Sequence, residues 1–557
     1  MSENNSEKNR VNISFDEKTY PVKVSTSLNE LLSTLPSRSP SPLAAVVNGE
    51  LQSLSYRLYA DSSIVWLDHS NSGSRLYKRG LLFVMLMACT KLFPDRRPHV
   101  SHSLDNGIYC LMEDGGQLTL EEIAVLHREM ESLIKEDLPI YENLLSKDDA
   151  VRFFQAKGDV EKAELLSCRR SETLHLYSCG GFSEYLFGHM PTRTGQLSDF
   201  KLLPFDEGFV LMLPAQKDAS FSTEQFSEPR RLQAVLTETK LWGEKLGVGN
   251  ITQLNRLVKK GDLNELILVN EVLHSRELSR IADSIYADFP AVRVVLVAGP
   301  SSSGKTTFTQ RLSLQFRALG LRPVTISLDD YFLNRCDTPL DEYGKPDFES
   351  VHALDLELFN KNLHDLIDGR QVLIPRYDFV TGARAAEGVP YTLAADQLVI
   401  IEGLHGLNED LTAAIPAQNK RKVYVSALTQ LNMDDYTPIP SSDNRLFRRI
   451  VRDMQFRNAS AEQTLLHWPS VRRGEFANIF PFQEQADYFF NSSLIYELTV
   501  LRPLVEPALE EIKPSSPVFL EAKRLKRFIQ YFAEGEAKCI PLDSILQEFL
   551  GKSCFFN

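Results

Sequence analysis

A cluster of residues near the middle of the chain has the types and spacing that bind phosphate groups. Residues 299–306 read GPSSSGKT, between the apolar segment VVLVA at 294–298 and the helix-like TFTQRL at 307–312. A GxxxxGK[ST] pattern between a strand and a helix is typical of a loop whose backbone N–H groups surround phosphates at the positive end of the helix. The residues expected to contact ATP are Gly299, Ser301, Ser302, Ser303, Gly304, Lys305, Thr306 and Thr307.

Three side chains near this pattern have more specific expected roles. The Lys305 ammonium would bridge the β- and γ-phosphates, and the Thr306 hydroxyl would bind Mg²⁺. Glu402 ends a second apolar segment, LVIIE, and is expected to hold Mg²⁺ or a water bound to it. The pattern therefore predicts ATP and Mg²⁺ as cofactors. The alternative, an accidental glycine-rich turn, does not account for strand, loop, lysine and helix in the required order.

Two adjacent carboxylates follow another apolar segment, in ISLDD at 326–330. In open sheets of parallel strands, ligands bind at the carboxyl ends of the strands, so we expect both side chains at the same edge as the phosphate loop. A carboxylate there can accept the proton of an attacking hydroxyl, and we expect Asp329 to do so. The alternative is that Asp329 and Asp330 cap a helix.

Four arginines recur in DNRLFRRIVRD at 443–453. At 3.6 residues per turn their side chains span about 100° of one helical face. Because like charges at this spacing repel each other, we expect the stripe to bind an anion, as a lid over a triphosphate would. The alternative is a solvated basic face paired with neighbouring carboxylates. The arginines are Arg445, Arg448, Arg449 and Arg452, and the neighbouring carboxylates are Asp443, Asp453 and Glu462.

The elements that would position these residues form a multidomain α/β protein. Apolar segments at 292–299, 323–330, 397–403 and 422–428 alternate with helical stretches, which predicts a parallel sheet covered by helices. We expect a helical connector before this domain and a helical tail after it. The predicted divisions of the chain are 1–70, 71–225, 226–288, 289–505 and 506–557.

The first two divisions are expected to be smaller mixed units. Residues 11–25 alternate apolar and polar side chains about a polar turn, as a hairpin does, and helical spacing follows at 28–35. In the second unit, Thr119 and Glu122 form a capping pattern at the start of an amphipathic helix that ends before Pro139. These patterns predict an α/β unit followed by an α+β unit.

Composition limits the partners and the compartment. The chain has 557 residues, with 61 basic and 74 acidic side chains and a net charge of −13, which disfavours affinity of the whole molecule for nucleic acid or an anionic membrane. Its seven cysteines form no CxxC pair, as is usual for reduced thiols. The polar start has no apolar signal core, and the longest apolar run is too short for a membrane span. We expect a cytoplasmic protein.

The segment 290–500 resembles uridine kinases and their phosphoribulokinase relatives. GPSSSGKTT, SLDDYF, PDFESVHALDLELF, VLIPRYDFVTGAR, VIIEGLHGL and DNRLFRRIVRD occur in the family's order. The resemblance implies ATP-dependent phosphorylation of a hydroxymethyl group, usually the 5′-hydroxyl of a nucleoside, with another sugar or sugar phosphate as the alternative acceptor. It assigns Asp329 as the catalytic aspartate and Arg445 and Arg448 as catalytic lid arginines, with Arg449 and Arg452 on ATP. Oligomers are common in the family, and the tail could serve such contacts.

The same resemblance predicts the acceptor pocket, with two departures. Glu349 stands where the family has an aspartate that binds ribose hydroxyls, and Gly382 replaces a histidine that reads the base. A base edge left without its partner would cost about 1–3 kcal/mol, unless His352 or His405 substitutes in space. The residues expected to contact the acceptor are Asp329, Phe348, Glu349, Tyr377, Phe379 and Arg384.

The N-terminal half resembles threonyl-tRNA synthetases. Residues 11–70 resemble the ubiquitin-like TGS domain, and KLFPD, LIKEDLPI and TRTGQLSDFKLL resemble the editing-associated domain. Arg79 and Phe83 replace the HxxxH pair of that domain, and only His189 remains of its downstream motif, so we expect no aminoacyl-ester hydrolysis. Contact with RNA or tRNA, a regulatory role and a purely structural role remain open. An ATP-switched RNA-binding regulator is therefore an alternative function.

Overall fold

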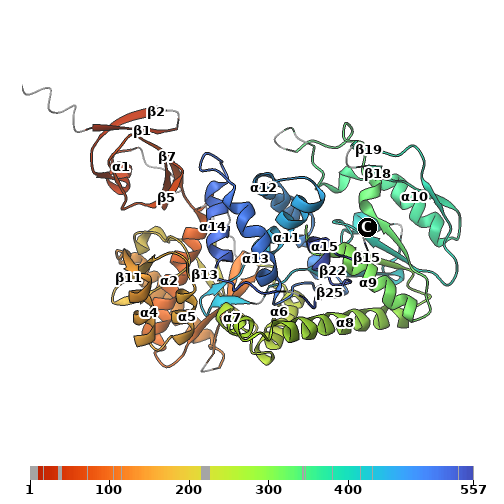
Figure 1. Ribbon diagram of the computed structural model, residues 1–557, viewed down its shortest axis with the longest axis horizontal. Coiled ribbons are helices and arrows are strands. Elements are labelled where there is room, and N and C mark those ends of the chain that lie inside the picture. The colour runs from red at the N-terminus through yellow and green to blue at the C-terminus, as the bar shows by residue number, and fades with distance from the viewer. Residues whose placement is uncertain are drawn as a thin grey trace, which may run out of the picture.

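The structure is a computed structural model, and its architecture is mixed α/β with several separate sheets, as predicted. Figure 1 shows the N-terminal elements in red and orange on one side of the molecule and the sheet that contains β15 (Val294–Ala298) on the other. The C-terminal helices, in blue, lie between them. The described residues are 10–16, 18–35, 41–71, 73–104, 106–113, 116–214, 226–341, 344, 346–378, 381–413, 415–429, 431–536 and 538–555.

The N-terminal unit is a five-stranded sheet that packs on one short helix. The predicted hairpin is confirmed as an antiparallel pair, and β1 also runs parallel to β7. Helix α1 begins after Ser27, whose side chain and Glu30 form a capping box. Its buried Leu28 and Leu31 pack against Ile13 of the sheet. In spatial order the strands are β2 (Lys18–Lys23), β1 (Arg10–Phe15), β7 (Ser62–Leu67), β4 (Ala44–Val47) and β5 (Glu50–Ser53), and the helix is α1 (Leu28–Thr34).

The second unit surrounds the apolar helix α2 (Ser74–Leu92). The predicted capping box of Thr119 and Glu122 begins α3 (Leu120–Lys135). Among the described residues, no helix combines the length and apolar character that crossing a membrane requires. One sheet has the order β13 (Lys201–Phe205), β14 (Gly208–Met212), β9 (Gly107–Met112) and β8 (Pro98–Leu104). The other has β10 (Tyr141–Ser146), β11 (Thr173–Cys179) and β12 (Phe182–Glu184), with α4 (Lys147–Ala156) and α5 (Val160–Ser167) beside it.

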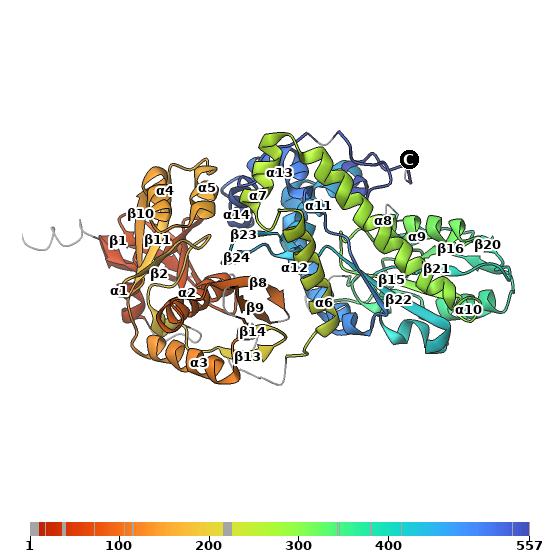
Figure 2. The same cartoon turned by 90° about the horizontal axis from the view of Figure 1, so that it is seen from below.

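The region predicted as a helical connector contains three helices. The longest, α8, packs along α9 (Lys305–Ala318) of the next sheet unit, as Figure 2 shows from below. Helix α7 ends at Gly261, whose φ of 86° is the left-handed conformation that favours glycine after a helix. The three helices are α6 (Arg230–Lys245), α7 (Ile251–Lys260) and α8 (Leu263–Ala287).

The predicted parallel sheet is confirmed, and β15 is its central strand. All five residues of β15 are buried because a parallel strand in such a sheet is covered on both faces. The strand order is β16 (Val324–Ser327), β21 (Val399–Glu402), β15, β22 (Lys420–Ser426) and β25 (Tyr488–Asn491), and every pairing is parallel. Its helices are α9 (Lys305–Ala318), α10 (Leu356–Ile367), α11 (Ser441–Phe456), α12 (Ala461–Asn478) and α13 (Glu497–Glu510). Short strands beside it are β17 (Val372–Ile374), β18 (Tyr377–Asp378), β19 (Ala383–Arg384) and β20 (Val389–Tyr391).

The C-terminal tail packs on its own chain. Helix α14 (Phe519–Ile529) lies against α13, and the short α15 (Gln547–Leu550) lies against α11. Ile545, Leu546 and Phe549 belong to the same buried core as β15 and α9. These three side chains are therefore covered within the chain, whereas Leu542 of the same tail is exposed. The contacts between copies stay a prediction.

Candidate functional site

The loop between β15 and α9 has a backbone that its sequence requires. A Cβ on Gly299 would lie 1.9 Å from the Val425 carbonyl oxygen, so no larger residue fits there. Gly304 has a φ of 85°, and Ser302 also has a positive φ of 58°. These conformations turn the chain tightly from the strand into the helix. The loop therefore exposes the N-terminal end of α9 at the carboxyl edge of the sheet.

The Lys305 ammonium lies between loop carbonyls and two carboxylates. It donates to the carbonyl oxygens of Gly299 and Pro300 at 3.0 and 3.2 Å. Burial lowers the pKa of Lys305, while the negative charges of Glu402 and Asp329 raise it. Lys305, Glu402 and Asp329 come from α9, β21 and the turn after β16, and they are close enough for their charges to act on one another.

Glu402 and two hydroxyls make a small set of oxygen atoms that suits Mg²⁺. The Glu402 Oε1 atom lies 3.5 Å from both the Thr306 and the Ser327 hydroxyl oxygens. Burial raises the pKa of Glu402 to about 7, with Asp329 adding to the shift and Lys305 opposing it. Mg²⁺ usually takes one or two protein oxygens and completes its shell with water and phosphate, so these residues fit it. In the described ranges no group of three or more His, Cys, Asp or Glu side chains could hold a metal alone.

Two buried hydroxyls in the loop have no hydrogen-bond partner in the part of the chain that the structure describes. They belong to Ser302 and Ser303, whose side chains are 4% and 0% exposed. Buried polar atoms normally have a hydrogen-bond partner, so we expect these two hydroxyls to contact a ligand. Phosphate oxygens would supply acceptors, and the loop residues therefore fit a nucleotide.

Asp329 lies in a short turn directly after β16. Its backbone N–H donates to the Ser327 hydroxyl at 3.3 Å, which caps the turn. Burial raises the pKa of Asp329, and the positive charges of Lys305 and Arg457 oppose that shift. The neighbouring Asp330 has another role, because it accepts from the Tyr377 backbone N–H and pairs with Arg376.

Three of the four predicted arginines lie beside the phosphate loop. Arg445 donates to the Ser301 carbonyl oxygen at 3.0 Å, and Arg449 donates to the Ser301 hydroxyl at 2.7 Å. Arg452 pairs with Asp453, and its positive charge lowers the pKa of Lys305. Asp453 also pairs with Arg449. The alternative, in which these arginines pair with neighbouring carboxylates, therefore holds for part of the stripe.

Arg448 departs from the predicted stripe. It is fully buried and donates to Glu497 at 2.6 Å and to the Ser492 carbonyl oxygen at 2.7 Å. Its guanidinium also lies over the Phe549 ring. The expectation that Arg448 faces the phosphate loop is wrong, because its position on α11 directs it toward α13, where a buried carboxylate compensates its charge.

Sequence reasoning missed two carboxylates that contact the loop. Glu475 accepts from the Ser301 backbone N–H at 3.1 Å and pairs with Arg445. Glu548 accepts from the backbone N–H and the hydroxyl of Thr307 at 3.1 and 2.9 Å. Both come from segments far along the chain, and neither lies in a pattern that points to the loop.

The predicted acceptor residues include two aromatic rings that pack on Phe332 and a carboxylate near the loop. The rings of Phe348 and Tyr377 both contact Phe332, with centroids 6.0 and 5.6 Å from it. Burial raises the pKa of Glu349 to about 7, while Arg449 and Lys305 lower it and Glu475 and Asp347 raise it further. Glu349 is thus close to the charged groups of the loop. Phe379 lies outside the described residues.

Arg384 and Gly382 have structural duties in this region. Arg384 donates to Asp355 at 2.9 Å and to the carbonyl oxygens of Tyr331 and Phe332, so it holds the turn that carries Asp329. Gly382 has a φ of 68°, and a Cβ there would lie 2.8 Å from the Arg335 guanidinium. A histidine could not stand at this position without moving Arg335.

Replacement of Glu349 by glutamine is expected to raise stability at pH 8. A carboxyl group whose folded pKa is raised above its unfolded value of 4.5 destabilises the fold as pH rises toward 7, because the unfolded chain loses its proton first. The gain should be on the order of 1–3 kcal/mol at pH 8 and vanish below pH 4.5. Urea unfolding at both pH values measures it, with the exposed Glu357→Gln as a control. An equal gain at both pH values would contradict this cause.

Arg79 and Phe83, which replace the HxxxH pair, make structural contacts in the second unit. Arg79 donates to the His189 carbonyl oxygen, and Phe83 is fully buried in the core against Phe182. The His189 ring contacts Glu142 instead, at 3.1 Å. Neither position therefore offers a metal-binding or acid-base side chain where the synthetase domain has a histidine.

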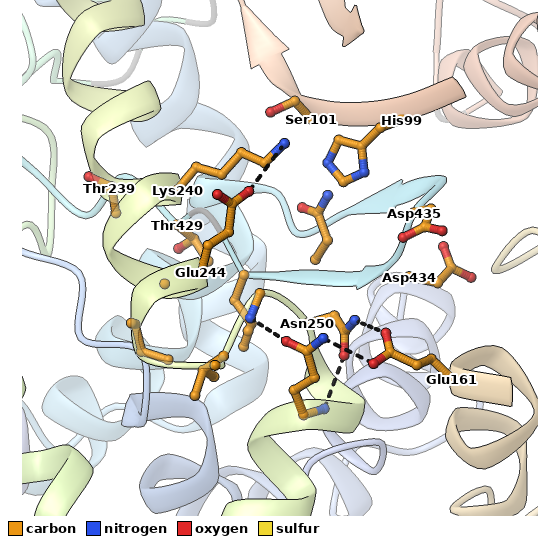
Figure 3. A pocket seen from close by; sticks show the side chains of 18 of the residues that line it. His99, Ser101, Glu161, Thr239, Lys240, Glu244, Asn250, Thr429, Asp434 and Asp435 are labelled. Carbon is orange, nitrogen blue, oxygen red and sulfur yellow. Dashed lines mark hydrogen bonds and ion pairs between the residues drawn. The ribbon is translucent and has the colours of Figure 1, made fainter. Parts of the chain in front are cut away.

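A separate cavity of about 720 Å³ lies between the second unit, the connector and the parallel sheet unit. Figure 3 shows His99 and Ser101 of β8 on one side, Lys240 of α6 on another, and Asp434 and Asp435 at one end. None of the described residues predicted for the site lines this cavity. Residues of both halves of the chain line this cavity, and it lies apart from the phosphate loop.

Residues 294–495 match the family model described as Phosphoribulokinase / Uridine kinase family. Over this region the chain is similar to members of that family. The match begins at the first residue of β15 and ends just before α13, so it contains the phosphate loop, Glu402 and the α11 arginines. The kinase resemblance predicted from the sequence is confirmed for this region.

The N-terminal region is similar to threonine–tRNA ligases, as predicted. That of Carboxydothermus hydrogenoformans is 29% identical over 187 residues, which cover 33% of this chain and 29% of the ligase. The chain thus spans less than a third of the length of the ligases that it matches.

Two solved structures are also similar. A possible uridine kinase from Bacillus stearothermophilus is 19% identical and covers 39% of this chain and 97% of its own, with a TM-score of 0.27. A D-glycerate 3-kinase from Cryptococcus neoformans var. grubii is 17% identical and covers 52% of this chain and 87% of its own, with a TM-score of 0.21.

Proposed function

We propose that the chain is an ATP-dependent kinase that transfers the γ-phosphate to the 5′-hydroxyl of a ribonucleoside. The observation that carries this proposal is that Lys305, Glu402 and Asp329 follow or end three neighbouring strands of the parallel sheet, β15, β21 and β16, at the same edge. There the Glu402 carboxylate lies 3.5 Å from the Thr306 hydroxyl. This arrangement combines a phosphate-binding loop with a carboxylate that can accept a hydroxyl proton. The family match of residues 294–495 supports the same class of reaction.

Each residue of the site has a distinct proposed role. The backbone N–H groups of the loop and the Lys305 ammonium would hold the phosphates and stabilise the charge that develops on them. Asp329 would accept the proton of the attacking hydroxyl at a carboxylate oxygen. Arg445 and Arg449 would keep the loop in place through Ser301. Mg²⁺ held by Thr306 and Glu402 would neutralise phosphate charge when bound.

The proposed acceptor pocket lies between Glu349 and the rings that contact Phe332. A carboxylate can accept hydrogen bonds from two neighbouring sugar hydroxyls, and aromatic rings suit the face of a base. The second candidate acceptor is another sugar or a sugar phosphate, because the matched family unites phosphoribulokinases with uridine kinases.

An acceptor screen tests this function. The purified full chain is incubated with Mg²⁺ and ATP and with separate ribonucleosides, pentoses and pentose phosphates, and ADP formation is measured against a sample without acceptor. We expect one ribonucleoside to stimulate ADP formation most. Stimulation by a pentose phosphate alone would support the second candidate, and ATP hydrolysis that no acceptor changes would contradict both.

A further inference from the structure

The C-terminal segment 540–551 lies against the phosphate loop. The Glu548 carboxylate accepts hydrogen bonds from the backbone N–H and the hydroxyl of Thr307, in the first turn of α9. The residue before α9 is Gly304, which has no side chain to cap the helix. A carboxylate supplied from the tail therefore takes the favourable position for an anion at this helix end.

The segment is anchored on both sides of Glu548. Ile545 is fully buried, and one of its methyl groups lies 2.4 Å from where a Cβ on Gly304 would stand. The Ser544 hydroxyl donates to Glu271 of α8, and the Phe549 ring is fully buried. These contacts hold the carboxylate against the loop, so its place at Thr307 follows from the packing of the whole segment.

A nucleotide phosphate and Glu548 would use the same donors. The backbone N–H at the start of α9 is the kind of group that the loop offers to phosphates, and Glu548 already accepts from it at Thr307. The carboxylate is also close enough to Lys305 and Glu402 for its charge to act on both. Two anions at one donor set repel each other, so they exclude each other there.

We propose that the C-terminal segment 540–551 regulates the site as an internal competitor of ATP, with Glu548 in the place of a nucleotide phosphate. This inference rests on the proposed function, because it takes the loop to be a nucleotide site. The chain then has a closed state, with the tail on the loop, and an open state that binds ATP. The measured affinity for ATP is lowered in proportion to the fraction of open state.

Nucleotide affinity in a charge-removing variant tests the proposal. The dissociation constant of a fluorescent ATP analogue with Mg²⁺ is measured for the full-length wild type, Glu548→Ala and the control Glu536→Gln. Glu536 is exposed on the same tail and pairs with Lys538. We expect Glu548→Ala to bind about tenfold or more tightly, because the Thr307 donors are then free for a phosphate and no competing negative charge remains at the loop, and the control to be unchanged. Equal or weaker binding by Glu548→Ala would overturn the proposal and leave Glu548 as a cap of α9.

Hydrogen exchange in the wild type tests the proposal without a substitution, so the result does not depend on whether the variant folds correctly. Addition of ATP and Mg²⁺ should speed exchange of the backbone amides in 540–551, and unchanged or slower exchange despite binding would overturn the proposal.

The proposed function and the role of the tail would be contradicted by different results. Absence of nucleotide binding in the wild type and in Glu548→Ala would contradict the proposed function, whereas binding with equal constants would contradict only the tail's role.

Discussion

Replacement of Asp329 by asparagine is expected to lower acceptor-dependent phosphoryl transfer roughly 100- to 10,000-fold. Asparagine keeps the size of the side chain and its place in the turn after β16, but it cannot accept a proton. The phosphate donors belong to the loop and to Lys305, so ATP binding should persist. Measurement of kcat by ADP release, together with the ATP dissociation constant, separates these two effects.

The neighbouring carboxylate gives a matched control. Asp330 accepts from the Tyr377 backbone N–H at 3.3 Å and lies 3.6 Å from Arg376, so it supports β18. Asp330→Asn should therefore lower kcat far less than Asp329→Asn. Equal losses in the two variants would mean that Asp329 is not the base, and that the turn as a whole is sensitive to substitution.

The second large effect is expected from replacement of Glu475 by glutamine. Glu475 is fully buried, pairs with Arg445 and Arg472, and accepts from the Ser301 backbone N–H. Removal of its charge leaves two arginines without a buried partner, which typically costs about 3–5 kcal/mol. We expect a loss of this size in the free energy of unfolding measured with urea.

An exposed ion pair provides the comparison for Glu475. Asp396 lies 2.7 Å from Arg322, and more than half of the pair's side-chain surface faces solvent. Such pairs contribute at most about 1 kcal/mol, so Asp396→Asn should change stability little. If Glu475→Gln cost no more than Asp396→Asn, the buried cluster would not be what holds α11 and α12 at the phosphate loop.

The elements that position the site were predictable because local patterns determine them. Apolar runs with turn residues at their ends became the strands β15, β16, β21 and β22, which pair in parallel as predicted. Thr119 and Glu122 began α3 as predicted, because a capping box needs only residues of one turn. The domain boundaries, the roles of the site residues and an RNA contact by the N-terminal half stay predictions.

The departures concern partners that come from distant parts of the chain. Helical spacing placed four arginines on one face of α11, but it could not show that Arg448 meets a carboxylate of α13. Arg384 likewise lies in a predicted acceptor motif and yet holds the turn after Asp329. Glu475 and Glu548 were missed because neither lies near the loop in sequence. The carboxylate that pairs with each arginine is determined by tertiary packing, and a local sequence pattern cannot predict it.

Transfer of labelled phosphate from ATP would show whether the chain phosphorylates a ribonucleoside. The full chain is incubated with Mg²⁺, γ-labelled ATP and the ribonucleoside selected by the acceptor screen, and the products are separated and identified. We expect the label to appear in a nucleoside 5′-monophosphate with the wild type and to fall to background with Asp329→Asn. Label found only in inorganic phosphate, at the same rate with and without the nucleoside, would contradict the proposed function.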